Sequence, residues 1–180
     1  MQFSSHLTVG AVTALVSVKA GWIGLESLDI LAVLLGCMLP DIDHPHSALG
    51  RRLKVLSVPI SKVFGHRGIT HSLLIIAAGM WLLLYKLQAP PGWVTGLALG
   101  YFSHLAADFM TVAGIPLLWP WRQRFCFPLP IRTGSLSEHL IVALLVASSV
   151  TWTACGNQRC QPVLLELQMA VAQFSAGTPK

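Results

Sequence analysis

The chain has 180 residues, of which 54% are hydrophobic and only 11% are charged. Soluble domains carry about 25% charged residues, so the composition argues against a soluble core and favours one membrane-embedded domain. The net charge of +5 does not indicate a nucleic-acid partner, because the basic residues lie in connecting segments and not on one helix face. We therefore expect an all-α membrane protein, and the sequence offers no basis for naming a protein partner.

Apolar segments follow one another along the chain and predict a bundle of about five membrane helices. The last three approach the roughly 20 residues that a span needs, whereas the first two are short enough to be tilted or only partly inserted. Pro40 ends the second segment, and Pro90, Pro91 and Gly92 mark a tight turn between the third and the fourth. The expected helices cover residues 3–18, 27–39, 70–87, 92–110 and 136–154.

Two long loops, residues 40–69 and 111–135, carry most of the Lys and Arg residues. The positive-inside rule places both loops in the cytoplasm, which predicts a multi-pass protein with its N-terminus inside and its C-terminus outside. Residues 1–154 then form the membrane-embedded domain, and residues 155–180 form a tail with an amphipathic helix at 163–174. Cys155 and Cys160 at the start of this tail form a disulfide if they face an oxidising compartment.

Histidines and carboxylates gather at the segment ends that this topology places on the cytoplasmic side. Ionisable side chains are costly near hydrocarbon and are usually kept for function. Imidazole and carboxylate are also the ligands of zinc-type sites. We expect one to three divalent metal ions there, zinc first, with manganese or another metal as the alternative. The predicted ligands are His6, Asp41, His66, His71, His104 and Asp108.

Spacing supports two of these groups. His104 and Asp108 are four residues apart, so they share one face of a helix; the alternative is a His–Asp hydrogen bond that satisfies two buried polar groups. Asp41, Asp43 and His44 directly follow a helix end, where the helix dipole disfavours carboxylates and a purely structural role is less attractive. We expect Asp43 or His44 to orient ligands or to act as a general base.

The run from His66 to Ser72 is the most distinctive motif. Thr70 is expected to cap the third helix. Arg67 is expected to hold a phosphate with its planar guanidinium group, assisted by Arg51 or Arg52. The alternative makes Arg67 a cytoplasmic anchor and the two histidines of the run polar residues at the interface.

Glu138 and His139 open the last segment and are second-rank candidates for holding the metal or its ligands. Ser135 and Glu138 fit a capping box, in which Ser135 is the N-cap and Glu138 the third helical residue. We therefore expect Glu138 to serve first as a helix cap.

These motifs together resemble the YdjM-type family of LexA-regulated, inner-membrane, metal-dependent hydrolases. The resemblance covers about residues 1–150 and implies a bacterial inner-membrane enzyme. That family is similar to the zinc-dependent phospholipase C and P1-type nuclease superfamily, helical enzymes that cleave phosphoesters with a His- and Asp-bound zinc cluster. The chain departs from that superfamily in lacking a second helix with a His-x-x-x-Glu motif. The motifs that carry the resemblance are His6, Pro40-Asp41-Ile42-Asp43-His44, His66-Arg67-Gly68-Ile69-Thr70-His71-Ser72 and His104-Leu105-Ala106-Ala107-Asp108.

We expect a membrane-bound hydrolase whose active site faces the cytoplasm and which cleaves a phosphoester in a lipid or lipid-linked substrate with metal-activated water. One alternative is an ion- or proton-coupled transporter, but a transport pathway needs polar groups across the membrane. The outer halves of the segments, such as 73–85 and 140–150, contain no charged residue. The other alternative is a non-catalytic membrane adaptor with a structural metal, which a closed four-ligand site would favour.

Overall fold

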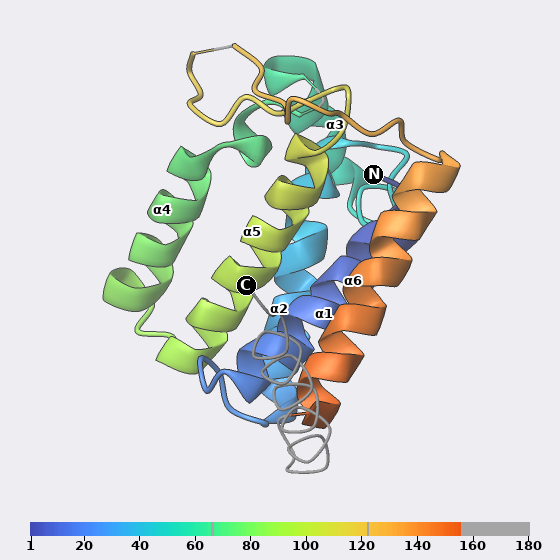
Figure 1. Ribbon diagram of the computed structural model, residues 1–180. Helices are drawn as coiled ribbons and strands as arrows, with labels where there is room; N and C mark the ends of the chain where they lie inside the picture. The colour runs from blue at the N-terminus through green and yellow to red at the C-terminus, as the bar shows by residue number, and fades with distance from the viewer. Residues whose placement is uncertain (66, 122, 156–180) are drawn as a thin grey trace, which may run out of the picture.

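The computed structural model describes residues 1–65, 67–121 and 123–155, and over these residues the protein is all-helical. The long helices run side by side as a bundle (Figure 1). The α-helices are α1 (Phe3–Lys19), α2 (Ser27–Met38), α3 (Lys54–Phe64), α4 (Leu73–Trp81), α5 (Pro91–Phe109) and α6 (Leu136–Ala154). Short 3-10 helices η1 (Leu39–Asp43) and η2 (Ile69–His71) precede α3 and α4, and a π-helical turn η3 (Leu82–Lys86) extends α4.

All five predicted segments form helices, so the all-α prediction is confirmed. The largest difference is in the third, which begins at Leu73 and not at residue 70. Ser72 caps this helix by accepting a hydrogen bond from the Ile75 backbone, so the prediction that Thr70 is the cap was wrong. The prediction that residues 40–69 are a loop was also wrong, because α3 forms there with Pro59 inside it.

Helices α2 and α5 make the most extensive contact in the described part of the chain, and α1 packs against both of them and against α6. Glycines allow the α2 and α5 backbones to approach closely, as small residues do between membrane helices. A Cβ atom at Gly100 would overlap the Val33 carbonyl oxygen, and one at Gly36 would overlap that of Leu97. This contact therefore fixes how α2 and α5 lie relative to each other.

Helix α6 is the one described helix that is long and apolar enough, by length and composition, to cross a membrane. Helix α4 with η3 forms a shorter apolar helix, Leu73–Lys86. Leu136, Leu140 and Leu144 of α6 are largely exposed. An exposed apolar surface of this kind suits contact with lipid or with another protein better than contact with water.

Helix α3, the loop between α5 and α6, and the N-terminus all lie at the same end of the bundle (Figure 1). The C-terminal ends of α2 and α5 lie at this end of the bundle, as do the beginnings of α1, α4 and α6. Most of the predicted site residues lie on these helix ends. The predicted helix at 163–174 and Cys160 lie outside the described residues, so the tail and its disulfide stay predictions.

Candidate metal centre

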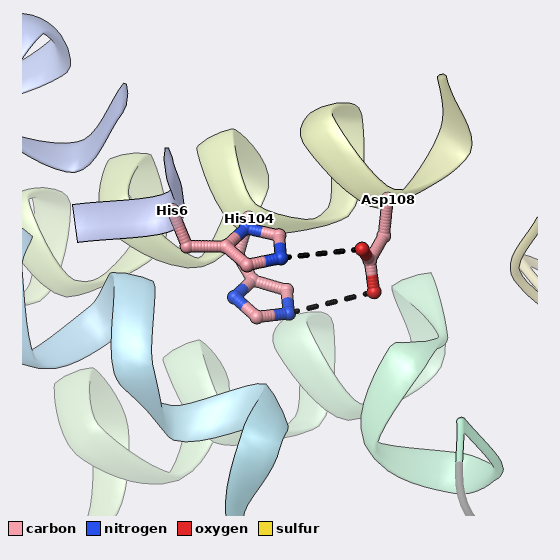
Figure 2. Close-up of side chains that lie close together, drawn as sticks. All are labelled: His6, His104 and Asp108. Carbon is pink, nitrogen blue, oxygen red and sulfur yellow. Dashed lines mark ion pairs between the residues drawn. The ribbon is translucent and has the colours of Figure 1, made fainter. Parts of the chain in front are cut away.

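Asp108, near the end of α5, is the centre of a cluster of buried polar side chains, and its side chain is 2% exposed. Its Oδ1 atom lies 3.2 Å from His6 Nε2. Its Oδ2 atom lies 3.4 Å from His71 Nε2 and 3.7 Å from His104 Nε2. Figure 2 shows His6 and His104 side by side, each directed at one oxygen of Asp108. Three imidazoles from α1, η2 and α5 thus converge on one carboxylate.

Two cationic groups complete the surroundings of Asp108. The Met1 amino group lies 2.7 Å from Oδ1, and Arg67 Nη2 donates to the same oxygen at 2.8 Å. Arg67 Nη1 donates to Thr111 Oγ1 at 3.3 Å, and this hydroxyl in turn donates to the Asp108 carbonyl. These contacts fix the carboxylate of Asp108 and the guanidinium of Arg67 relative to each other.

The hydrogen bonding of His104 determines which of its nitrogens faces the cluster. His104 Nδ1 lies 2.7 Å from the Cys37 carbonyl oxygen, which can only accept, so Nδ1 carries the proton. In the neutral ring Nε2 then has a free lone pair, and it faces Asp108 Oδ2 at 3.7 Å and Asp41 Oδ1 at 3.8 Å. Nε2 is buried and has no hydrogen-bond partner among the described residues. A lone pair that faces two carboxylates is favourable when a cation lies between them.

Asp43 holds His71 from the other side of the cluster. The Asp43 carboxylate is fully buried and accepts hydrogen bonds from the Arg67 backbone at 2.9 Å and from Thr70 Oγ1. Its Oδ2 lies 3.3 Å from His71 Nδ1, which leaves His71 Nε2 directed at Asp108. Burial lowers the pKa of the His71 imidazole, but its hydrogen bonds to Asp108 and Asp43 outweigh burial and raise that pKa above its ordinary value. Carboxylate–imidazole pairs of this kind commonly orient metal ligands.

Two overlapping groups of side chains can hold a metal ion. One is His6, His104 and Asp108, and the other is Asp41, His71 and His104; within each group the ligand atoms lie within 4.8 Å of one another. Ligands about 2.1 Å from a tetrahedral zinc ion lie about 3.4 Å apart, and the carboxylate–imidazole distances here run from 3.2 to 3.8 Å. His104 has one nitrogen left for ligation, so the two groups describe one shared site and not two independent ones.

Five of the six predicted ligands therefore lie together, and the sixth, His66, falls outside the described residues. Asp43 and Arg67 contact this cluster as well. His44 is half-buried, and its ring meets the His46 ring edge to face at 5.7 Å.

The structure does not bring the remaining candidates into the cluster. Arg51 and Arg52 are exposed in the turn before α3. His139 is exposed, and its Nδ1 donates to the Ser135 carbonyl at 2.8 Å. Ser135 caps α6, as predicted, by accepting from the Glu138 backbone.

Glu138 is fully buried, but backbone groups engage its carboxylate. It accepts from the Gln2 backbone at 2.8 Å and from the Gly134 backbone at 2.8 Å, and so ties the start of α1 to the start of α6. A capping box would direct this carboxylate to the Ser135 N–H, which instead donates to the Arg132 carbonyl. Glu138 thus links two helices more than it caps one.

Sequence reasoning missed four participants: the Met1 amino group, Thr111, the Thr70 hydroxyl as a partner of Asp43, and the Cys37 carbonyl. Thr111 lies three residues after Asp108, close enough along the chain to be a candidate. No sequence signal marks the Cys37 carbonyl, because every residue has a carbonyl group and only the packing of α2 on α5 selects this one.

Fold and site together define an all-helical protein with a buried His–Asp cluster, suited to a divalent cation, at one end of a bundle. The chain belongs to the YdjM inner membrane protein family, whose family model matches residues 1–178. This membership confirms the predicted family and the bacterial inner membrane as its location.

Similar proteins carry names that agree with this family membership. The chain is 48% identical over 125 residues to Inner membrane protein YdjM of Escherichia coli (strain K12) and to that of Shigella flexneri; the alignment covers 65% of this chain and 63% of each relative. It is 42% identical over 115 residues to the Uncharacterized protein YvsG of Bacillus subtilis (strain 168), covering 64% of this chain and 71% of that protein. The matched part is thus less than two thirds of the first two relatives. No solved structure matches the chain.

Proposed function

We propose that the protein is a membrane-bound, metal-dependent hydrolase that cleaves a phosphoester bond in a lipid or lipid-linked substrate. The observation that carries the proposal is His104, whose Nδ1 is occupied by the Cys37 carbonyl and whose free Nε2 faces two carboxylates. That arrangement is strongly favourable with a cation between the three groups. In this proposal His6, Asp41, His71, His104 and Asp108 hold a divalent metal, zinc first.

A divalent metal bound there supplies Lewis-acid chemistry for the attack of water on phosphorus. The residues of the chain do the rest. Asp43 is a positioning residue, because it is buried, already accepts two hydrogen bonds and holds Nδ1 of His71. His44 is more accessible to solvent than Asp43, which leaves it as the candidate general base. Arg67 fixes Asp108 and offers its guanidinium to a phosphate oxygen.

The proposal also includes a multi-pass topology with the metal centre facing the cytoplasm. Helix α3 with its flanking turns and the loop after α5 belong to the two segments that carry most of the basic residues, and both lie at the end of the bundle where α5 ends and α1 begins (Figure 1). A single orientation therefore satisfies the positive-inside rule for both segments and gives the cluster at these helix ends access to cytoplasmic water. Helices α4 and α6 carry no Asp, Glu, Lys or Arg beyond Glu138, which disfavours a transport pathway along them.

A cavity next to the cluster favours a reactive site over a closed structural one. This cavity has a volume of about 530 Å³, and Arg67, which contacts Asp108, lines it. Ligand pockets commonly have volumes of about 300–1,000 Å³. A purely structural metal in an adaptor has no use for such a cavity.

The first test is the metal content of the full-length protein, purified in detergent and measured by inductively coupled plasma mass spectrometry. We expect bound zinc or another divalent metal, its loss in His104→Ala, and its retention in His139→Ala, a matched histidine outside the cluster. Hydrolysis of short-chain phospholipids by the same samples is expected to follow metal content. Wild-type protein that binds no divalent metal refutes the proposal, and metal binding without hydrolysis of any phosphoester substrate supports the adaptor instead.

A further inference from the structure

The cavity beside the metal centre lies between the C-terminal end of α3 and the loop that follows α5. Its apolar wall includes Phe64 and Trp119, whose rings meet edge to face at 5.9 Å. Its polar wall includes Arg67 and Arg124, and among the described residues no acidic side chain lines it. We propose that this cavity, with Arg124 as a second anion-binding residue, is a subsite for the phosphate group of a phosphomonoester or phosphodiester.

Arg67 is held in place for this task. Its backbone adopts a left-handed conformation with a φ of 56°, and its N–H donates to Asp43, so the strained conformation is anchored by a buried carboxylate. Both terminal nitrogens of its guanidinium are engaged, with Asp108 and with Thr111. The remaining Nε atom is buried and has no hydrogen-bond partner among the described residues. An unsatisfied buried N–H is costly, and a ligand oxygen that accepts from it removes that cost.

Arg124 lines the same cavity as Arg67 but lies in the loop that follows α5. Arg124 Nη1 donates to the Ala113 carbonyl at 3.1 Å, which restrains the guanidinium while its other N–H groups stay available. Two guanidinium groups on one cavity, with no carboxylate among the described residues that line it, create a positive potential that favours an anion. Planar guanidinium groups bind phosphate oxygens with paired, charge-assisted hydrogen bonds.

The subsite inference rests on the proposed function, because this phosphate would be the group that water hydrolyses at the metal centre. Arg67 connects the cavity to the metal centre, since it lines the cavity and contacts the Asp108 carboxylate. The phosphate can belong to a soluble ester or to a lipid head group. A lipid would also place its apolar part against Trp119 and Phe64, whereas a soluble glycerol phosphate would leave that wall unused.

The test measures phosphate binding to the full-length protein by isothermal titration calorimetry, in detergent and with a metal chelator present. The probes are sn-glycerol 3-phosphate and dihexanoyl phosphatidic acid below its micelle concentration. We expect Arg124→Gln to weaken binding of both at least about tenfold. The matched control Arg132→Gln removes one exposed arginine of the same loop that does not line the cavity, and is expected to change affinity less than about twofold. Thermal melting checks that both variants fold.

Each outcome decides one point. Equal weakening by Arg124→Gln and Arg132→Gln would mean that only net charge matters, and overturns the subsite, as does the absence of saturable binding of either probe. If Trp119→Leu weakens binding of the lipid probe alone, the phosphate comes from a lipid head group. If it changes binding of neither probe, the phosphate comes from a soluble ester. Because these titrations exclude metal, wild-type phosphate binding without hydrolysis contradicts only the proposed function. Hydrolysis that Arg124→Gln leaves unchanged contradicts only the subsite.

Discussion

Asp43→Asn tests whether the cluster is built to hold a metal. The substitution keeps the size of the side chain and removes its charge. The carboxylate is fully buried, accepts from the Arg67 backbone and the Thr70 hydroxyl, and lies 3.3 Å from His71 Nδ1. All three groups approach the same oxygen, Oδ2, so an asparagine oxygen at that place keeps the contacts but lacks the negative charge that strengthens them. His71 then has a weaker, neutral partner to direct its Nε2 toward Asp108.

The expected effect can be estimated from similar sites. Loss of a hydrogen-bonded carboxylate behind a metal-ligating histidine costs about 10–100-fold in metal affinity, which corresponds to about 1.4–2.7 kcal/mol. Loss of a hydrogen bond to a charged group also lowers folding stability by about 1.5–3 kcal/mol. Asp43→Asn is therefore expected to lower both metal affinity and melting temperature.

The assay is competition for zinc between the purified protein and a chelator of known affinity. Asp29→Asn is the matched control, because Asp29 also accepts a backbone hydrogen bond, from Gly24 at 3.1 Å, but lies in the first turn of α2, at the end opposite to Asp41 and Asp43. We expect Asp29→Asn to change stability without changing zinc affinity. A folded Asp43→Asn protein that binds zinc within about twofold of wild type refutes the role of Asp43 in positioning a ligand.

Three further predictions concern packing, the α1–α6 link and the metal itself. Gly100→Ala is expected to lower the free energy of unfolding by about 1–3 kcal/mol or more, because the added Cβ overlaps the backbone of α2. Gly79→Ala has open space around the added Cβ and is expected to raise the free energy of unfolding by about 0.5–1 kcal/mol. Thermal melts of both variants in detergent distinguish the two effects. Glu138→Gln is expected to cost about 1–3 kcal/mol by weakening two backbone hydrogen bonds, and unchanged zinc affinity in the same sample checks that Glu138 is no ligand. Zinc at 100 times its dissociation constant is expected to stabilise the wild type by about 2.7 kcal/mol, and a His104→Ala protein that gains as much on addition of zinc contradicts the assigned ligand set.

The positions of the helices could be predicted from sequence because long apolar runs end at strong signals. Pro40, and Pro90 with Pro91, stop or start a helix irrespective of tertiary contacts, and the bounds of α2 and α5 agree with them. Helix α3 could not be predicted in the same way. Pro59 lies inside it, and its buried residue is the polar Ser57 while large apolar side chains such as Val55 are exposed, which is the reverse of the pattern that marks a core helix.

The convergence of the site was predictable in part. The predicted topology places the ends of different segments on one side, and His6, His71 and Asp108 from three of these ends do lie together. The roles of single residues depended on distances that a sequence does not contain. Arg67 illustrates this limit, since its guanidinium engages Asp108 and Thr111 in addition to lining the cavity.

Helix packing and ligand geometry are coupled in this fold through α2. Gly100 lies one turn before His104, and a Cβ at Gly100 would meet both the Val33 carbonyl and, at 2.8 Å, the Cys37 backbone nitrogen. The same close approach brings the Cys37 carbonyl within 2.7 Å of His104 Nδ1 and so selects Nε2 as the nitrogen that faces the cluster. A substitution that separates α2 from α5 at Gly100 should therefore weaken metal binding as well as stability, although Gly100 touches no ligand atom. A metal site held by backbone packing in this way needs fewer hydrogen-bonding side chains around it, which suits a bundle with few polar residues.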